Sequence, residues 1–145
     1  MENDNSKKNY DIILESYFNK NKIYNSPEKK ACFIIGLLIR KVVNKQKKEL
    51  NGNTPFLNRV KAFNLNGIED IKKLISETTG KLIEFKLSFD SLVRLFKKNF
   101  EEINVWNLSN TDSNFYILLG YVSSWDLFNQ GEDSDETFEE DEENE

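Results

Sequence analysis

The sequence contains no histidine and only one cysteine among its 145 residues, and these shortages exclude several kinds of site. Histidine is the commonest general base and a common metal ligand, so its absence disfavours acid–base catalysis and zinc or copper binding. The cysteine, Cys32, lies in the apolar segment ACFIIGLLI, where burial raises the pKa of a thiol and makes it inert. One cysteine cannot form an internal disulfide, as is usual for a cytoplasmic protein. We therefore expect a non-enzymatic cytoplasmic protein without a metal or other cofactor.

Proline, glycine and long apolar runs are also scarce. Two prolines and six glycines argue against a fold made of many turns and short strands. The longest apolar run covers residues 31–39, about half the length needed to span a bilayer, and the N-terminus lacks the apolar core of a signal peptide. The sequence predicts no interaction with a membrane.

Apolar residues recur at helical spacing through most of the chain. Expected helices cover residues 8–18, 26–49, 54–63, 68–86, 89–103 and 109–128. Ser26 followed by Pro27, and Ser109 with an acid three residues later, are typical helix starts. Gly80 predicts a bend or a break in the fourth of these helices. The fold class is therefore all-α: a helical bundle of five or six helices in residues 1–128.

Two further glycines, Gly36 in IIGLL and Gly120 in ILLGY, lie inside apolar helices. A glycine at such a position often allows two backbones to approach closely. We expect the two helices to cross at these residues.

Charge is sorted along the chain. Residues 20–98 hold 18 basic and 7 acidic side chains, whereas residues 129–145 hold 10 acidic side chains and no basic one. The terminal segment is too charged to pack, so it is predicted to be a disordered acidic tail. A basic body suggests a polyanionic partner, and the tail would then compete with nucleic acid for the basic face or serve only solubility.

The basic residues that helical spacing groups together are the candidate nucleic-acid contacts. Lysine outnumbers arginine among them, which suits point-charge contacts to phosphates without sequence preference. The candidates are Arg40, Lys41, Lys45, Lys47, Lys48, Arg59, Lys61, Arg94, Lys97 and Lys98. For the cluster at residues 40–48, nucleic-acid binding and simple solvation of a helix face are equally good interpretations of the residues alone. Base stacking on Tyr10, Tyr17, Tyr24 or Trp106 is a further possibility, whereas the phenylalanines are expected in the core.

Three blocks in a fixed order resemble one protein family. They are ACFIIGLLIRKVVNKQKKELNGNTPFLNRVKAFNL, a helix ending KLIEF, and LSNTDSNFYILLGYVSSWDLF. Together they resemble the C-terminal helical domain of the large subunit of type I-B CRISPR Cascade complexes, with Gly36, Gln46, Pro55-Phe56 and Phe115 to Tyr121 at the matching positions. The resemblance covers roughly residues 28–128.

A chain that begins with Met and holds only this domain resembles the separate small subunit of such a complex. The resemblance implies a non-catalytic helical subunit that contacts the backbone and large subunits and other copies of itself. Its basic faces would support the guide RNA and the target or displaced DNA strand through phosphate contacts.

A protein-interaction adaptor or an inhibitor is the competing hypothesis. Its acidic tail would imitate phosphate charge and occupy the basic groove of another protein, without any binding of nucleic acid. Salt dependence separates the two hypotheses, because affinity for phosphates falls steeply as the salt concentration rises.

Overall fold

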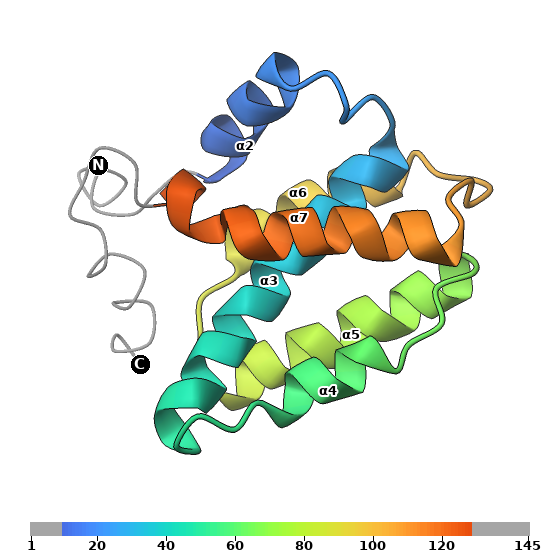
Figure 1. Ribbon diagram of the computed structural model, residues 1–145. Helices are drawn as coiled ribbons and strands as arrows, with labels where there is room; N and C mark the ends of the chain where they lie inside the picture. Colours follow the sequence, from blue (N-terminus) through green and yellow to red (C-terminus); the bar gives the residue numbers. More distant parts are fainter. Residues whose placement is uncertain (1–9, 129–145) are drawn as a thin grey trace.

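The computed structural model describes residues 10–128, which contain six α-helices and no strand (Figure 1). The helices are α2 (Tyr10–Lys20), α3 (Pro27–Glu49), α4 (Pro55–Lys61), α5 (Ile68–Glu84), α6 (Asp90–Phe100) and α7 (Asn110–Phe128). The predicted all-α bundle is therefore confirmed. The predicted acidic tail, residues 129–145, lies outside the described residues.

Local signals in the sequence fix where the long helices begin. The Ser26 side chain accepts a hydrogen bond from the Lys29 backbone N–H at 3.3 Å, and Pro27 occupies the first helical position of α3. At the start of α7 the Ser109 hydroxyl accepts from the Asp112 N–H at 3.0 Å. Both predicted helix starts are confirmed.

Helix α5 continues without interruption past Gly80, so the predicted break does not occur. The buried residues Ile71, Leu74, Thr78 and Leu82 lie on both sides of the glycine along one face. Burial of this stripe outweighs the helix-propensity cost of one glycine, which is about 1 kcal/mol.

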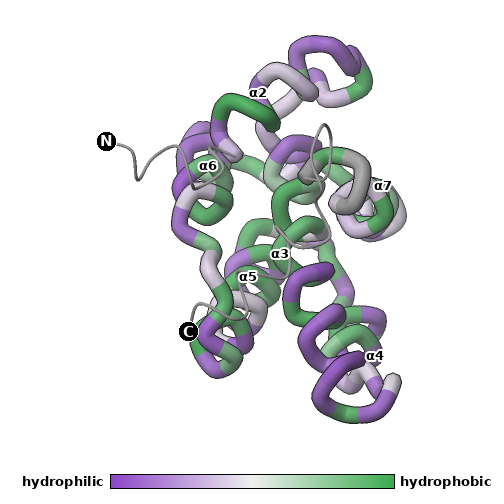
Figure 2. The backbone as a smooth tube through the Cα atoms, turned by 90° about the vertical axis from the view of Figure 1, so that its left-hand side faces the viewer, coloured by the Kyte–Doolittle hydropathy of each residue, from purple (hydrophilic) through white to green (hydrophobic). Residues whose placement is uncertain are grey.

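Helix α3 is the centre of the bundle and contacts α4, α5, α6 and α7. Residues 31–39 are all buried, because neighbouring helices surround the first half of α3 on several sides (Figures 1 and 2). Cys32 is fully buried there, and this burial raises the pKa of its thiol, as the sequence predicted. No helix within residues 10–128 has the length and apolar character required to cross a membrane.

Helices α3 and α7 cross at the two glycines predicted to meet. A Cβ atom added to Gly36 would overlap the carbonyl oxygen of Ile117 and lie 2.7 Å from the Tyr121 backbone nitrogen. A Cβ added to Gly120 would overlap the Phe33 carbonyl oxygen. The backbones are therefore closer than any residue with a side chain would allow.

Aromatic rings attach α2 to this core. The Phe18 ring and the Tyr24 ring each lie edge-on to the Phe33 ring, and they are tilted against each other; the three centroid distances are 5.1–5.5 Å.

Trp106 is also part of the core. Its side chain is 9% exposed and donates a hydrogen bond from Nε1 to Ser113 Oγ at 3.0 Å. Tyr24 and Trp106 are thus core residues, and the suggestion that they stack on bases was wrong for both, because packing already covers their rings.

Candidate nucleic-acid interface

The structure divides the predicted basic residues among three places. Five of them lie at the end of α3 and on α4; we call these the basic end, and they are Lys45, Lys47, Lys48, Arg59 and Lys61. Three lie on α6 and form what we call the α6 stripe, namely Arg94, Lys97 and Lys98. Arg40 and Lys41 lie nearer the middle of α3. Helices α4 and α6 are well separated in both views, so the ten residues do not form one continuous face (Figures 1 and 2).

A buried hydrogen bond places α4 beside the end of α3. Gln46 is 3% exposed, and its side-chain oxygen Oε1 accepts from the Phe56 backbone N–H at 2.9 Å. Between the helices Asn51 and Gly52 adopt positive φ angles of 53° and 91°, which turn the chain back. Gln46 was a position of the family resemblance, but its role in joining α3 to α4 was not predicted, because the partner is a backbone group ten residues away.

The basic end presents more positive than negative charge to solvent. Lys47 and Lys48 are exposed in the last turn of α3, and Lys61 is exposed at the end of α4. Lys45 is half-buried, with Nζ 3.1 Å from a Glu49 carboxylate oxygen. Lys45 is thus paired with Glu49, and Arg59 is paired with an acid of α5, as described next.

Arg59 is held by an ion pair with α5. Its Nε and Nη2 atoms donate to the two carboxylate oxygens of Glu77 at 2.9 and 2.6 Å, and its guanidinium lies 4.9 Å from the centre of the Phe63 ring. This hydrogen-bonded ion pair raises the pKa of Arg59 and lowers the pKa of Glu77. Arg59 is therefore oriented but partly neutralised, an arrangement that the sequence did not predict because Glu77 lies 18 residues away.

Arg40 and Lys41 do not belong to the exposed basic surface. Arg40 donates from Nη1 to the Tyr121 carbonyl oxygen and from Nε to Asn44 Oδ1, both at 3.1 Å, and its guanidinium lies 4.7 Å from the Tyr121 ring centre. Lys41 is only 3% exposed. The structure therefore gives Arg40 a role in attaching α7 to α3, and it places Lys41 where a polyanion has little access.

The α6 stripe lies against acidic residues of α2. Lys98 Nζ is 3.0 Å from Glu15 Oε2, and Arg94 Nη2 is 3.9 Å from Asp11 Oδ2. Hydrogen bonding to Glu15 raises the pKa of Lys98, and Asp11 and Glu102 add to this effect. Acidic residues outnumber basic ones on α2, on α6 and just after it, where Asp11, Glu15, Asp90, Glu101 and Glu102 accompany Lys20, Arg94, Lys97 and Lys98.

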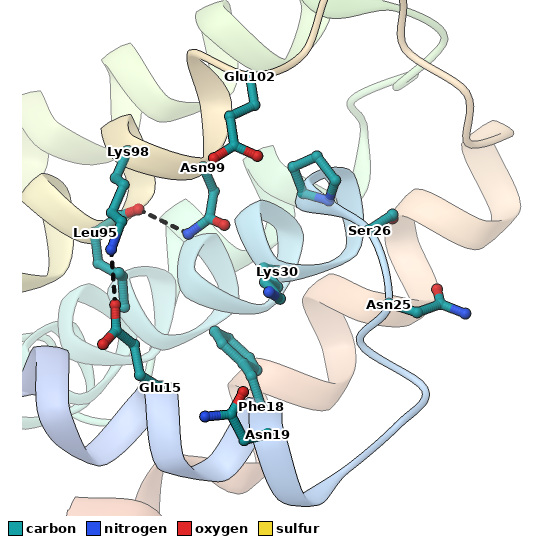
Figure 3. A pocket seen from close by; sticks show the side chains of 11 residues that line it. Glu15, Phe18, Asn19, Asn25, Ser26, Lys30, Leu95, Lys98, Asn99 and Glu102 are labelled. Carbon is teal, nitrogen blue, oxygen red and sulfur yellow. Dashed lines mark hydrogen bonds and ion pairs between the residues drawn. The ribbon is translucent and has the colours of Figure 1, made fainter.

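A pocket of about 450 Å³ adjoins this stripe, between α2, the start of α3 and α6 (Figure 3). Its walls carry charges of both signs, Lys30 and Lys98 with Glu15 and Glu102, and the Lys98–Glu15 ion pair forms part of one wall. Such mixed charge gives a phosphate chain no net attraction. The basic end is therefore the stronger candidate for binding nucleic acid.

Residues 10–128 form a small all-helical domain arranged around the central helix α3, with a basic end on α3 and α4. A family model described as the C-terminal domain of the CRISPR-associated protein TM1802 matches residues 1–134. Since this match covers most of the chain, the protein belongs to that family of CRISPR-associated proteins, and the predicted resemblance is confirmed. No curated protein and no solved structure gives a significant match.

Proposed function

We propose that this protein is a non-catalytic subunit of a type I-B Cascade complex, and that its basic end binds phosphates of the guide RNA or of a target DNA strand without reading their sequence. It acts in the cytoplasm beside the backbone and large subunits and further copies of itself. Membership of the CRISPR-associated family supports this proposal. The observation that carries it is the exposed basic end, where Lys47, Lys48 and Lys61 project from two helices joined by a buried hydrogen bond.

Rigid support makes these lysines suitable for binding a phosphate backbone. The central helix is fixed by the buried residues 31–39 and by the glycine crossing with α7. A backbone that is already ordered loses little conformational entropy on binding. Lysine also acts as a point charge and does not require one orientation of the phosphate, which fits binding that ignores sequence.

Phosphate contacts are sufficient for a role in opening a target duplex. Exchanging a DNA duplex for an RNA–DNA hybrid is nearly balanced in free energy, so protein contacts to the backbones can decide whether the strands open. This role requires positive charge in a fixed position and no reacting group.

The test is the binding of a target duplex by a type I-B complex from the same source, assembled with this protein, without it, or with the triple variant Lys47→Glu, Lys48→Glu, Lys61→Glu. We expect the omission and the triple variant to weaken target binding at moderate salt. Each lost phosphate contact should also reduce the slope of log K against log salt by about 0.9. Lys47→Glu alone and Lys97→Glu alone form a matched pair, because each reverses one exposed lysine in the last turn of a helix. We expect the first to weaken target binding and the second to leave it unchanged.

Two results would contradict the proposal. Equal affinity of complexes assembled with the wild-type protein and with the triple variant would remove the basic end from the interface. Unchanged target binding without the protein, combined with its absence from the purified complex, would instead favour the adaptor or inhibitor hypothesis.

A further inference from the structure

We infer that the basic end is also the docking site of the protein's own acidic C-terminal segment, residues 132–145, which competes there with nucleic acid. That nucleic acid is the competing ligand rests on the proposed function. The docking of the segment is argued from geometry and charge alone.

The crossing of α3 and α7 brings the start of the acidic segment close to the basic end. Phe128, the last residue of α7, lies eight residues beyond Gly120, or about 12 Å along the helix. Lys47 lies eleven residues beyond Gly36, or about 17 Å along α3. Because these glycines mark the crossing, the Cα atoms of Phe128 and Lys47 are separated by less than about 40 Å for any crossing angle, even with a helix–helix distance of about 8–10 Å included.

Both helices also run toward the same side of the molecule after they cross, which shortens this distance further (Figure 1). The 17 residues that follow Phe128 can extend to about 56 Å, so they can reach beyond the basic end. The length of the segment is therefore sufficient to reach Lys47 and Lys48.

Charge selects the basic end from the surfaces within reach. The segment carries ten acidic residues and no basic one. At the basic end Lys47, Lys48 and Lys61 are exposed in the last turns of α3 and α4, whereas in the α6 stripe Arg94 and Lys98 are paired with Asp11 and Glu15 of α2. A polyanionic segment is attracted to the first surface and repelled from much of the second.

Covalent attachment makes this weak attraction effective. A short tether holds the segment at a millimolar effective concentration. If its intrinsic Kd resembles that of weak electrostatic binding, about 0.1 mM, the docked segment lowers the apparent affinity for nucleic acid by about tenfold at low salt. A long target strand, which makes many phosphate contacts at once, displaces it, whereas a short nonspecific strand does not.

Zero-length carbodiimide cross-linking of the full-length protein tests the docking without any nucleic acid. The acidic segment contains no lysine, so mass spectrometry can assign links from its carboxylates to individual lysines of the body. We expect links to Lys47, Lys48 and Lys61 that exceed links to Lys97, which is also exposed, and that disappear in 0.5 M salt, where the Debye length is about 4 Å. Equal yields at Lys47 and Lys97 would overturn the inference.

Competition is tested by binding a fluorescent single-stranded oligonucleotide to the full-length protein and to a variant whose ten segment acids are replaced by Asn or Gln. We expect about tenfold tighter binding by the variant at low salt and equal binding at high salt. If the cross-links form but neither protein binds the oligonucleotide, the proposed function fails and the docking stands. If both proteins bind it equally, competition is excluded and the proposed function stands.

Discussion

Helices α3 and α6 end with the same local feature, two adjacent lysines in the last turn, and yet the two places differ in charge. Lys47 and Lys48 end a helix that projects from the core, where Glu49 contacts Lys45. Lys97 and Lys98 end a helix that α2 covers, and Glu15 of α2 contacts Lys98. The comparison teaches that a basic helix end is a weaker candidate for binding a polyanion where a facing helix pairs its lysines with acids.

Loss of the glycine crossing should destabilise the whole helical bundle, and with it both the basic end and the α6 stripe. Gly120→Ala places a Cβ atom against the Phe33 carbonyl, so the two backbones must separate. We expect the free energy of unfolding to fall by about 3 kcal/mol, measured by denaturant unfolding. Gly80→Ala is the control, since nothing lies within 4 Å of the added atom, and it should stabilise the protein by about 0.5–1 kcal/mol. Equal stability of the two variants would show that the crossing is not tight.

A change at Gln46 should break the basic end and leave the α6 stripe intact. Gln46→Leu removes the acceptor of the buried Phe56 N–H and detaches the start of α4 from α3. We expect a loss of about 1–3 kcal/mol in unfolding free energy. Hydrogen exchange should accelerate in α4 and stay unchanged in α6. The exposed substitution Asn58→Leu is the control, and faster exchange in α6 of the Gln46 variant would contradict this local role.

Neutralising one lysine in each region compares their contributions to binding directly. Lys47→Gln and Lys97→Gln remove the same charge from exposed side chains in the last turns of two helices. We expect the first variant to lower the slope of log K against log salt by about 0.7 in single-stranded oligonucleotide binding, and the second to leave it unchanged. Equal slopes for the two variants would mean that the acids around α6 do not prevent its use.

The smallest expected effects concern the pH dependence of the ion pairs. The pKa of Glu77 is lowered from its ordinary value of 4.5, so its ion pair with Arg59 stabilises the fold above pH 4.5 and is lost as the pH falls through the lowered pKa. The pKa of Lys98 is raised from 10.5, so its stabilising effect is complete below pH 10.5 and is lost as the pH rises through the raised pKa. Thermal unfolding of Glu77→Gln and Lys98→Gln against wild type should therefore converge at opposite ends of the pH scale. Convergence of Glu77→Gln at alkaline pH would contradict this assignment.

Much of the fold could be predicted from the sequence because its causes are local. Helical spacing and the Ser26 and Ser109 caps act within a few residues, and the structure confirms them. The crossing of α3 and α7 is a long-range contact, but a glycine inside each apolar helix indicated it. Gly80 is the exception, since the buried stripe on both sides of it outweighs its own preference.

The candidate site was less predictable. The sequence located the lysines but not which of them remain exposed. Arg40 binds the Tyr121 carbonyl oxygen 81 residues away, and Lys41 is buried, although both continue the same helical pattern as Lys45 and Lys48.

The sequence by itself determined the helices and the sorting of charge along the chain, since propensity, capping and charge are properties of short segments. It also marked with two glycines the place where α3 and α7 approach closely. Only the tertiary structure decided which positive charges are neutralised. Glu15 meets Lys98 across 83 residues and Glu77 meets Arg59 across 18. Electrostatic attraction depends on the distance between charges in space, and packing of the helices sets that distance.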